Sequence, residues 1–510
     1  MSGGRLAEGP IREIRDLIYS PSITGADDAD FGEMCGLNQA HLVMLAQTGI
    51  LSAENARVLA RALRQVAREG RAALSSDPDL EDPYLAFEAR LSDLAGADIA
   101  GRIHIARSRN DIGATLHRLQ ARRHWRAISA ALDEARAALL DKALTHRDTL
   151  MPGHTHLQPA QPITYGYLMA SLATALARDA GRLADAYARI DACCLGAAAL
   201  GGSSFPIDRE LTAELLGFSR IETSCLDAVA SRDAVLELLF AVTTLAVTWS
   251  RGAQDFYVAF SHEFSGISLP DRIAGTSSIM PQKKNPIALE YLRTEASRAI
   301  GALTGALSAA RGTQFSISLD AIREGLDDVW AALHRVPGDL SLFTRIVESA
   351  EPAAERLAER CRANFATATD LADGLVRDHD LPFRHAHHIV GAVVREALAK
   401  GLSADAVDAA LVEAVAEPLL GRRLGLTDSF VRGCLDPRQA VAARRTRGGT
   451  APDEVERMVA DERAVLAGDV ARRHEREKRI DEAAAILADN LAELAGEAAD
   501  PVPLRRATQP

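Results

Sequence analysis

The chain has 510 residues, enough for about three domains, and its 47% hydrophobic and 25% charged residues are typical of a soluble globular protein. Aromatic residues make up only 5% while Ala and Leu are abundant, which favours helices over sheets. The formal net charge of −12 argues against nucleic-acid binding, so we expect local basic clusters to meet small anions.

Neither the cysteines nor the apolar segments indicate secretion or a membrane. The six cysteines form no CxxC pair and no regular framework, which predicts reduced thiols in a cytoplasmic protein. Residues 1–14 contain no apolar core of signal-peptide length. The longest strongly apolar uncharged run, 238–250, is shorter than the roughly 20 residues of a membrane span. We therefore expect a buried helix there and no membrane association.

Residues 1–107 are predicted to form a mostly helical N-terminal domain, with helices at 36–51, 53–74 and about 83–95. Asp82 directly precedes the third helix, where its simplest interpretation is an N-cap.

The segment 108–119, SRNDIGATLHRL, starts the next region. Arg109 offers a planar fork of donors that suits a carboxylate, although a solvated arginine is the simpler interpretation. We expect Asp111 to cap the helix that follows.

Residues 108–360 are predicted to form a central domain of about five long helices. The first apolar stripe alternates steps of three and four residues, so its members share one helix face: Trp125, Ile128, Leu132, Ala135 and Leu139. Similar stripes cover 172–190, 238–249 and 289–307, and a last helical stretch at 319–350 is predicted to break near Pro337. Helices this long, one of them apolar nearly all round, predict a bundle larger than one chain can close.

Polar segments at 151–162, 201–209 and 274–286 interrupt these helices. If the helices run antiparallel, consecutive breaks lie at opposite ends of the bundle, and one chain would struggle to bring the breaks together. Several subunits packed against one another could do so.

The segment 274–286, AGTSSIMPQKKNP, combines a small polar loop with two cations. We expect Ile279 and Met280 to anchor the loop against apolar neighbours, and Pro286 to start a helix. Hydroxyls and lysines next to a helix N-terminus predict an anion site. The simpler alternative is a Gly/Ser surface loop followed by solvated lysines.

Residues 361–460 are predicted to form a C-terminal helical domain, with a helix within 361–381 and another starting near Pro382. The spacing of His385, His387 and His388 does not fit a zinc site, so no metal is expected. The chain has no phosphate-cradling glycine loop and no dinucleotide fingerprint, so no cofactor is expected. Residues 461–510 are predicted to be a charged, solvated helix followed by a disordered end.

Three of these segments together resemble the signatures of the fumarase/aspartase superfamily: SRNDIGATLHRL, MPGHTHLQPAQPITYG and GTSSIMPQKKNP. The QKKNP ending resembles the argininosuccinate lyase branch, and the resemblance covers about residues 35–460. It implies an all-α, three-domain fold with a long central helical bundle. It also implies a homotetramer whose active sites are each shared by three subunits.

The resemblance further implies elimination of fumarate from an N-substituted L-aspartate, a small dicarboxylate substrate. A base removes the Cβ proton, the carbanion is delocalised into its neighbouring carboxylate, and the amine leaves with help from an acid. By resemblance Ser277 is the base, Lys283 and Asn285 hold the carboxylate, and His156 orients the substrate or relays the proton. The other expected substrate-binding residues are Ser108, Arg109, Asn110, Thr155, Gln158, Asp82 and Asn38.

The departures from the family pattern concern the other half of the substrate. Asn38 stands where the family has a serine, and Asp82 lacks the histidine that follows it in the family motif. Where argininosuccinate lyases carry a tyrosine, a glutamine and a lysine, this chain has Ile317, Ile322 and Gly325. Buried polar groups of a ligand that lose their partners cost about 1–3 kcal/mol each.

The released amine is therefore left open. One alternative is argininosuccinate, and the other is an N-substituted aspartate with a different amine, as for an ethylenediaminedisuccinate lyase-like enzyme. A third alternative is a non-catalytic, crystallin-like structural protein, which the full set of succinyl-binding residues disfavours. The physiological direction and the role of residues 461–510 are also left open.

Overall fold

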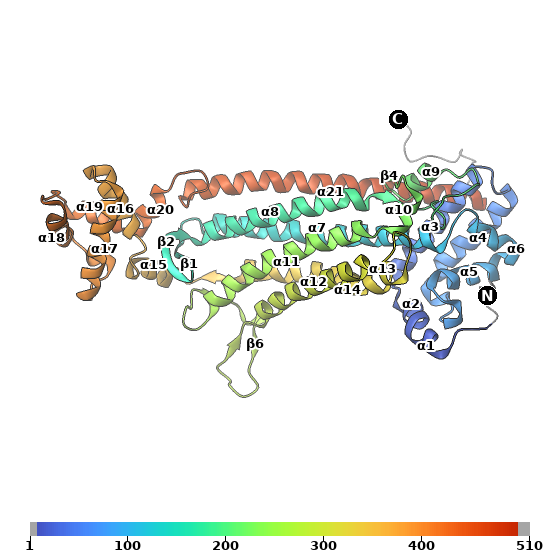
Figure 1. Cartoon of the computed structure of the whole chain (residues 1–510), viewed down its shortest axis with the longest axis horizontal. Coiled ribbons are helices and arrows are strands. Elements are labelled where there is room, and N and C mark those ends of the chain that lie inside the picture. Colours follow the sequence, from blue (N-terminus) through green and yellow to red (C-terminus); the bar gives the residue numbers. More distant parts are fainter. Residues whose placement is uncertain (1–7, 498–510) are drawn as a thin grey trace.

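Five long helices form the centre of the molecule and run antiparallel along its long axis (Figure 1). The computed structural model describes residues 8–497. The five helices are α7 (Arg109–Thr145), α8 (Tyr165–Ile190), α11 (Asp233–Phe260), α12 (Ile287–Arg311) and α14 (Asp327–Ser349). The predicted all-α fold with a long central bundle is confirmed.

The N-terminal part has a hydrophobic cluster of its own at one end of the bundle (Figure 1). The helices predicted from the sequence correspond to α3, α4 and α5. The helices of this N-terminal part are α1 (Arg12–Ile14), α2 (Ser20–Gly25), α3 (Asp28–Gln47), α4 (Ala53–Glu69), α5 (Pro83–Ala95) and α6 (Ala97–Ala100). Short π or 3-10 turns are η1 (Arg15–Tyr19), η2 (Arg71–Ala73), η3 (Pro78–Leu80) and η4 (Gly101–His104).

A second small helical cluster lies at the opposite end of the bundle (Figure 1). It consists of α15 (Ala354–Ala363), α16 (Ala368–His379), α17 (Phe383–Ala399), η7 (Ala404–Ala406), α18 (Ala409–Leu420), α19 (Asp428–Leu435) and α20 (Pro437–Ala443). The helix predicted to start near Pro382 is α17, for which Pro382 is the N-cap.

Helix α21 (Pro452–Ala495) then returns along the whole bundle to the N-terminal cluster. The domain boundary predicted at 460/461 falls inside this helix. Leu487, Leu491 and Ala495 are buried there, so the predicted solvated helix is solvated on one face only. The end predicted to be disordered, 498–510, lies outside the described residues.

Within residues 8–497, short strands form four two-stranded pairs between the helices. Two of the breaks that were predicted as loops are hairpins: β1 (Leu150–Thr155) with β2 (Gln158–Thr164), and β6 (Gly275–Thr276) with β7 (Lys284–Asn285). The other pairs are β3 (Ala192–Cys193) with β4 (Arg220–Ile221), and β5 (Ile267–Ser268) with β8 (Glu351–Pro352). The remaining short helices are α9 (Arg209–Leu215), α10 (Cys225–Ala230), η5 (Asp271–Ile273), α13 (Leu319–Ile322) and η6 (Glu324–Leu326).

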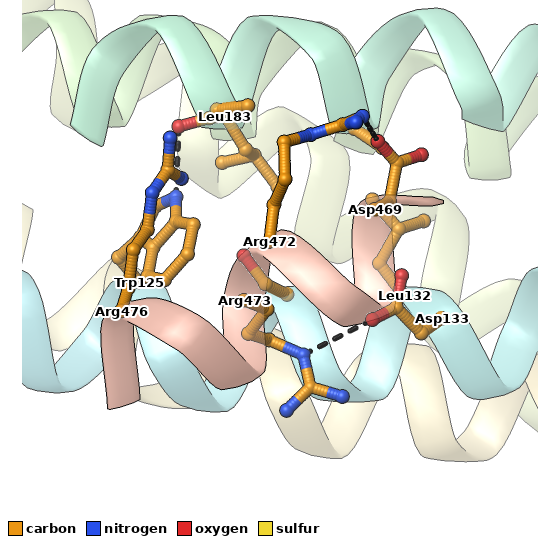
Figure 2. Close-up of a pocket in the computed structure, with 11 residues that line it drawn as sticks. Trp125, Leu132, Asp133, Leu183, Asp469, Arg472, Arg473 and Arg476 are labelled. Carbon is orange, nitrogen blue, oxygen red and sulfur yellow. Dashed lines mark hydrogen bonds and ion pairs between the residues drawn. The ribbon is translucent and has the colours of Figure 1, made fainter. Parts of the chain in front are cut away.

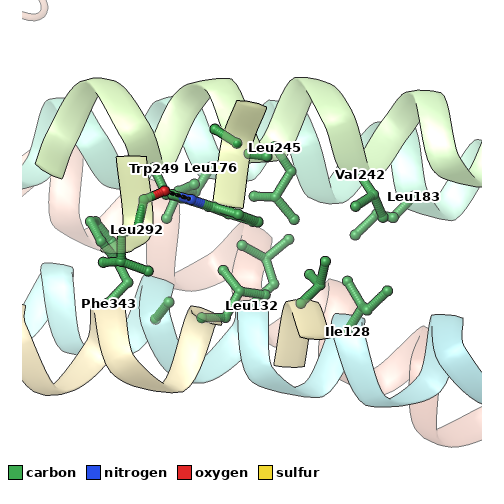
Figure 3. Packing of buried hydrophobic residues seen from close by; sticks show 14 of the residues in the cluster. Ile128, Leu132, Leu176, Leu183, Val242, Leu245, Trp249, Leu292 and Phe343 are labelled. Atoms are coloured by element: carbon green, nitrogen blue, oxygen red, sulfur yellow. Dashed lines mark hydrogen bonds between the residues drawn. The ribbon is translucent and has the colours of Figure 1, made fainter. Parts of the chain in front are cut away.

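The bundle core is built from the predicted stripes (Figure 3). All five residues of the first stripe are buried, and Trp249 donates its indole N–H to the Leu292 carbonyl oxygen at 3.2 Å. On α12 the stripe continues onto an exposed face, where Ile300 and Leu307 are 47% and 50% exposed. The break predicted near Pro337 is wrong: α14 is continuous there, because Val336 and Leu340 on either side are packed into the core.

Helix α11 is the one helix among residues 8–497 that is long and apolar enough, by length and composition, to cross a membrane. Its Leu238, Val242, Leu245 and Trp249 are buried against α8 and α12. The run at 238–250 is thus a core helix of the bundle, as predicted.

Salt bridges and ring contacts attach α21 to the bundle (Figure 2). Arg476 lies over the rings of Trp125 and Tyr187, and Arg473 donates to Asp133 of α7 at 3.1 Å. Arg136 of α7 is only 1% exposed, and its guanidinium pairs with Asp469 of α21 at 2.7 Å.

Substituting Asp469 with alanine is expected to lower the free energy of unfolding by about 2 kcal/mol, because it removes the nearest counter-charge of the buried Arg136. Urea unfolding followed by circular dichroism measures this change. The matched control is Asp461→Ala, at another aspartate of α21. This substitution breaks an exposed 3.8 Å ion pair with Arg447 and should lower the free energy of unfolding by about 0–1 kcal/mol. Equal losses of stability in the two variants would contradict the conclusion that the buried Arg136–Asp469 pair stabilises the attachment of α21.

Candidate active site

The first predicted motif begins helix α7. Ser108 is the N-cap and forms a capping box with Asp111, whose carboxylate accepts from the Ser108 N–H at 2.9 Å. The other Asp111 oxygen accepts from the N–H groups of Gly196 and Ala198 at 2.8 and 3.0 Å. Asp111 thus acts from the third helical position instead of at the cap, and it ties the motif to the 194–198 loop.

Arg109 lies at the surface beside two carboxylates. Its guanidinium donates to Glu81 and Asp82, both at 2.9 Å, and these hydrogen bonds outweigh partial burial and raise the pKa of Arg109. The neighbouring Asn110 donates to the Ala199 carbonyl oxygen at 2.9 Å. Glu81 was not predicted as a site residue. The one sequence feature that could have indicated it is its position directly before Asp82, the N-cap of α5.

Asp82 has two contacts, one structural and one electrostatic. Its Oδ1 accepts from the Leu85 N–H at 2.9 Å, so it is the predicted N-cap of α5, while Oδ2 faces Arg109.

Asp82→Ala is expected to lower the free energy of unfolding by about 1 kcal/mol through the lost cap, whereas Asp82→Asn should leave it nearly unchanged, because asparagine caps equally well. Thermal and urea unfolding of both variants separate the two contacts. An equal loss in Asp82→Asn would instead assign the stabilisation to the ion pair.

The second motif lies at the tip of the β1–β2 hairpin. Thr155 pairs with Gln158, and both are exposed. The two residues between them, His156 and Leu157, have positive φ angles of +53° and +59°. A two-residue turn of this kind favours Asn and Gly, so a His-Leu pair there is strained by about 1 kcal/mol or more per residue. Such strain at an exposed histidine is characteristic of functional sites.

The third motif forms the β6–β7 hairpin and its connecting loop. The Ser277 hydroxyl oxygen accepts from the Met280 N–H at 3.0 Å and the Ile279 N–H at 3.4 Å. Lys284 pairs with Asp271 at 2.8 Å and so fastens the base of the hairpin. Lys283 is exposed and makes no ion pair among residues 8–497, which leaves its ammonium group accessible.

Two expectations for this loop are corrected. Ile279 is 82% exposed and Met280 41%, so neither anchors the loop within its own chain. Pro286 is the N-cap of α12 and not its first residue, and strand β7 places Lys283 and Asn285 ahead of the helix terminus. The Asn285 amide donates to the Thr276 carbonyl oxygen at 3.2 Å across the hairpin.

Asn38, expected from its alignment with the family motif to bind substrate, lies in the N-terminal core. It is fully buried, donates to the Met34 carbonyl oxygen and accepts from Arg107, both at 2.9 Å. Its position inside the cluster is that of a structural residue, so Asn38 is omitted from the site proposed below.

The three motifs do not meet within one chain. The first begins α7 and the second follows it, and a helix of 37 residues is about 55 Å long at roughly 1.5 Å per residue. The β6–β7 hairpin projects from the side of the bundle (Figure 1). Successive breaks thus alternate between the ends of the bundle, as expected for antiparallel helices.

The segment that departs from the family pattern, around Ile317, Ile322 and Gly325, connects α12 to α14. Both isoleucines are half-buried. A Cβ atom on Gly325 would lie 2.3 Å from the Asp320 carbonyl oxygen and 2.8 Å from the Ala309 Cβ. This backbone therefore has no room for a side chain at Gly325. Among residues 8–497, no group of three or more His, Cys, Asp or Glu side chains is placed to hold a metal ion.

Residues 31–301 match the lyase family, and residues 365–442 match the family described as argininosuccinate lyase C-terminal. The chain is 38% identical over 466 residues to argininosuccinate lyase 1 of Shouchella clausii, covering 91% of this chain and 94% of that protein. The argininosuccinate lyase of Methanosarcina acetivorans is 36% identical, with 91% and 92% covered.

Solved structures give the same fold. A crystal structure of EDDS lyase in complex with formate has a TM-score of 0.84 and 31% identity, with 96% of this chain and 97% of that chain covered. A class II fumarase from Schistosoma mansoni, at 18% identity and a TM-score of 0.67, shares the fold, with 86% and 94% covered. The chain belongs to the argininosuccinate lyase family and is a carbon–nitrogen lyase.

Proposed function

We propose that this lyase cleaves argininosuccinate into arginine and fumarate, or catalyses the reverse addition. The observation that carries the proposal is the 38% identity over 91% of the chain to a protein named argininosuccinate lyase 1. A cytoplasmic location fits the cysteines, since all six are unpaired thiols.

Ser277 is the proposed base that removes the Cβ proton. A serine hydroxyl is a weak base, so its oxygen needs hydrogen-bond donors that stabilise negative charge on it. The N–H groups of Ile279 and Met280 already point at this oxygen. Lys283 and Asn285 would hold the carboxylate that gains charge in the carbanion, and one such donor is worth about 3 kcal/mol of transition-state stabilisation.

The substrate carboxylates would be bound by the other two motifs. Arg109 supplies the planar fork, and its contact with Glu81 and Asp82 must loosen or adjust when a carboxylate arrives. Asn110, Thr155 and Gln158 supply further polar groups, with Ser108 as the cap that holds the first motif in place. His156, on its strained turn, would orient the substrate or relay the proton.

The site we propose is assembled in a homotetramer, with one motif from each of three subunits. Two features support this assembly. The first and second motifs lie about 55 Å apart in one chain. The bundle also exposes large apolar side chains on α11 and α12: Phe240, Val247, Ile287, Tyr291, Ile300 and Leu307. Apolar side chains exposed along core helices are typical of subunit interfaces.

A second candidate substrate is an N-substituted aspartate carrying another amine. The observation that favours it is the closed packing at Gly325, which leaves no room for the family's lysine. The 31% identity to EDDS lyase is consistent with this alternative.

Fumarate release, followed by its ultraviolet absorbance, distinguishes the two. The enzyme is incubated with argininosuccinate, and separately with fumarate plus arginine, ethylenediamine and other amines. Turnover of argininosuccinate well above that of every other pair supports the proposal. Robust reaction with a diamine but not with argininosuccinate would establish the second candidate. No reaction with any of them would favour a crystallin-like structural role.

A further inference from the structure

A cavity of about 450 Å³ lies behind the β1–β2 hairpin and is distinct from most of the proposed site. Its walls come from the hairpin, from α8 and α11, and from α15 of the C-terminal cluster. Of the proposed active-site residues only Thr155 borders it. Small-molecule sites in proteins typically have volumes of about 300–1,000 Å³ and mostly apolar walls.

The cavity walls are largely apolar, with Met151, Ile163, Leu172, Phe256 and Leu357 among them. An apolar lining of this extent favours an aliphatic or aromatic group over a second dicarboxylate.

Opposite charges also border the cavity. Arg360 of α15 lies over the Phe264 ring at 5.7 Å and uses one nitrogen to donate to the Glu263 carbonyl oxygen. The rest of its guanidinium has no hydrogen-bond partner among residues 8–497. Asp255 of α11 makes no hydrogen bond or ion pair with another described residue, and its ionisable neighbours are Arg251 and His154. A ligand that carries both an anionic and a cationic group matches this pair.

Two buried hydroxyl groups in the cavity lining could also hydrogen-bond to a ligand. Tyr165 is 1% exposed and Thr450 is 6% exposed, and neither hydroxyl oxygen has a hydrogen-bond partner among the described residues. Native proteins seldom leave buried polar groups unpaired without a bound group or water to satisfy them.

We propose that this cavity binds an α-amino acid with an apolar side chain, and that binding acts on the hairpin that carries His156. Arg360 takes the carboxylate, Asp255 takes the ammonium group, and the side chain fills the apolar interior. Because the hairpin is both a wall of the cavity and the support of His156, an occupant changes the position of the catalytic turn. The cavity is then an effector site.

The test uses isothermal titration calorimetry on the full chain with L-leucine and two analogues that each lack one charge, 4-methylpentanoate and 3-methylbutylamine. Leucine is expected to bind most tightly. Arg360→Gln should weaken leucine and 4-methylpentanoate about tenfold or more, and Asp255→Asn should weaken leucine and the amine, because each variant removes one charged contact. Arg362→Gln, an exposed arginine of α15 outside the cavity, is the matched control and should bind as the wild type does.

Competition with fumarate tests whether the cavity is separate from the active site. The effect of leucine on kcat tests whether the cavity is coupled to the hairpin. Saturating fumarate should not displace leucine, and leucine should change kcat of the wild type but not of Arg360→Gln. No leucine binding, binding unchanged in both cavity variants, or displacement by fumarate would overturn the site. Binding with unchanged kcat would overturn the effect on the hairpin. The calorimetric result does not depend on which amine the enzyme releases, so it tests the cavity independently of the proposed function.

Discussion

Replacing Ser277 with alanine is expected to lower kcat for fumarate release by about 10³-fold while leaving the fold intact. A positioned base contributes roughly 10²–10⁴-fold to rate, and alanine removes the hydroxyl oxygen that accepts from the N–H groups of Ile279 and Met280. The side chain is half-buried on a projecting loop and does not belong to the hydrophobic core. Stability should therefore change by less than about 0.5 kcal/mol.

The matched control is Ser278→Ala. Ser278 is the next residue of the same loop and is exposed. It should retain activity within a few-fold of the wild type. Steady-state kinetics with whichever substrate the fumarate-release assay establishes, together with thermal unfolding of all three proteins, checks both expectations. Comparable losses of kcat in the two variants would show that the conformation of the loop matters and not the Ser277 hydroxyl. An active Ser277→Ala enzyme would show that Ser277 is not the base.

The bundle was predictable from the sequence because its signal is local and repeated. The stripe from Trp125 to Leu139 specifies one face of α7, and that face is buried in the core. Proline gave a misleading signal at Pro337, since tertiary packing on both sides holds α14 straight through it. The two hairpins were missed for a related reason. Their sequences are rich in proline, glycine and polar residues, which indicate a break in a helix but do not specify strand pairing.

The motifs predict the candidate site residue by residue, and these residues stay a prediction, whereas the surroundings of the site could not be predicted. His156 and Arg109 lie at exposed positions, and Ser277 is half-buried on its projecting loop. Asn38 shows the limit, because its burial depends on how α3 packs and not on the residues beside it in the sequence. The loop residues Ile279 and Met280 show another limit. Both side chains are exposed within the described residues, and a single sequence does not say which apolar residues will be exposed or what they face.

Mixing two inactive variants should restore activity, and this is the sharpest test of a site shared between subunits. One variant is Ser277→Ala. The other is His156→Asn, chosen because asparagine tolerates the positive φ of 53° at the hairpin turn and so removes the imidazole without adding strain. If Ser277 and His156 of one site come from different chains, random 1:1 mixing leaves about a quarter of the sites with both residues intact. If both came from the same chain, every site would contain one defect and no activity would return.

Co-expression of the two variants with different affinity tags, followed by sequential purification on both tags, isolates the mixed assemblies. The expected result is fumarate release at about a quarter of the wild-type rate in the mixed assemblies, less where the assembly is not random. Each variant carrying both tags in turn is the control and should stay at its own residual rate, because every site then lacks the same residue. Recovery can arise only if His156 on the β1–β2 hairpin of one subunit and Ser277 on the β6–β7 loop of another subunit complete the same site. A mixture that stays inactive, from variants that are each folded and assembled, would require the hairpin and the Ser277 loop of one chain to serve the same site.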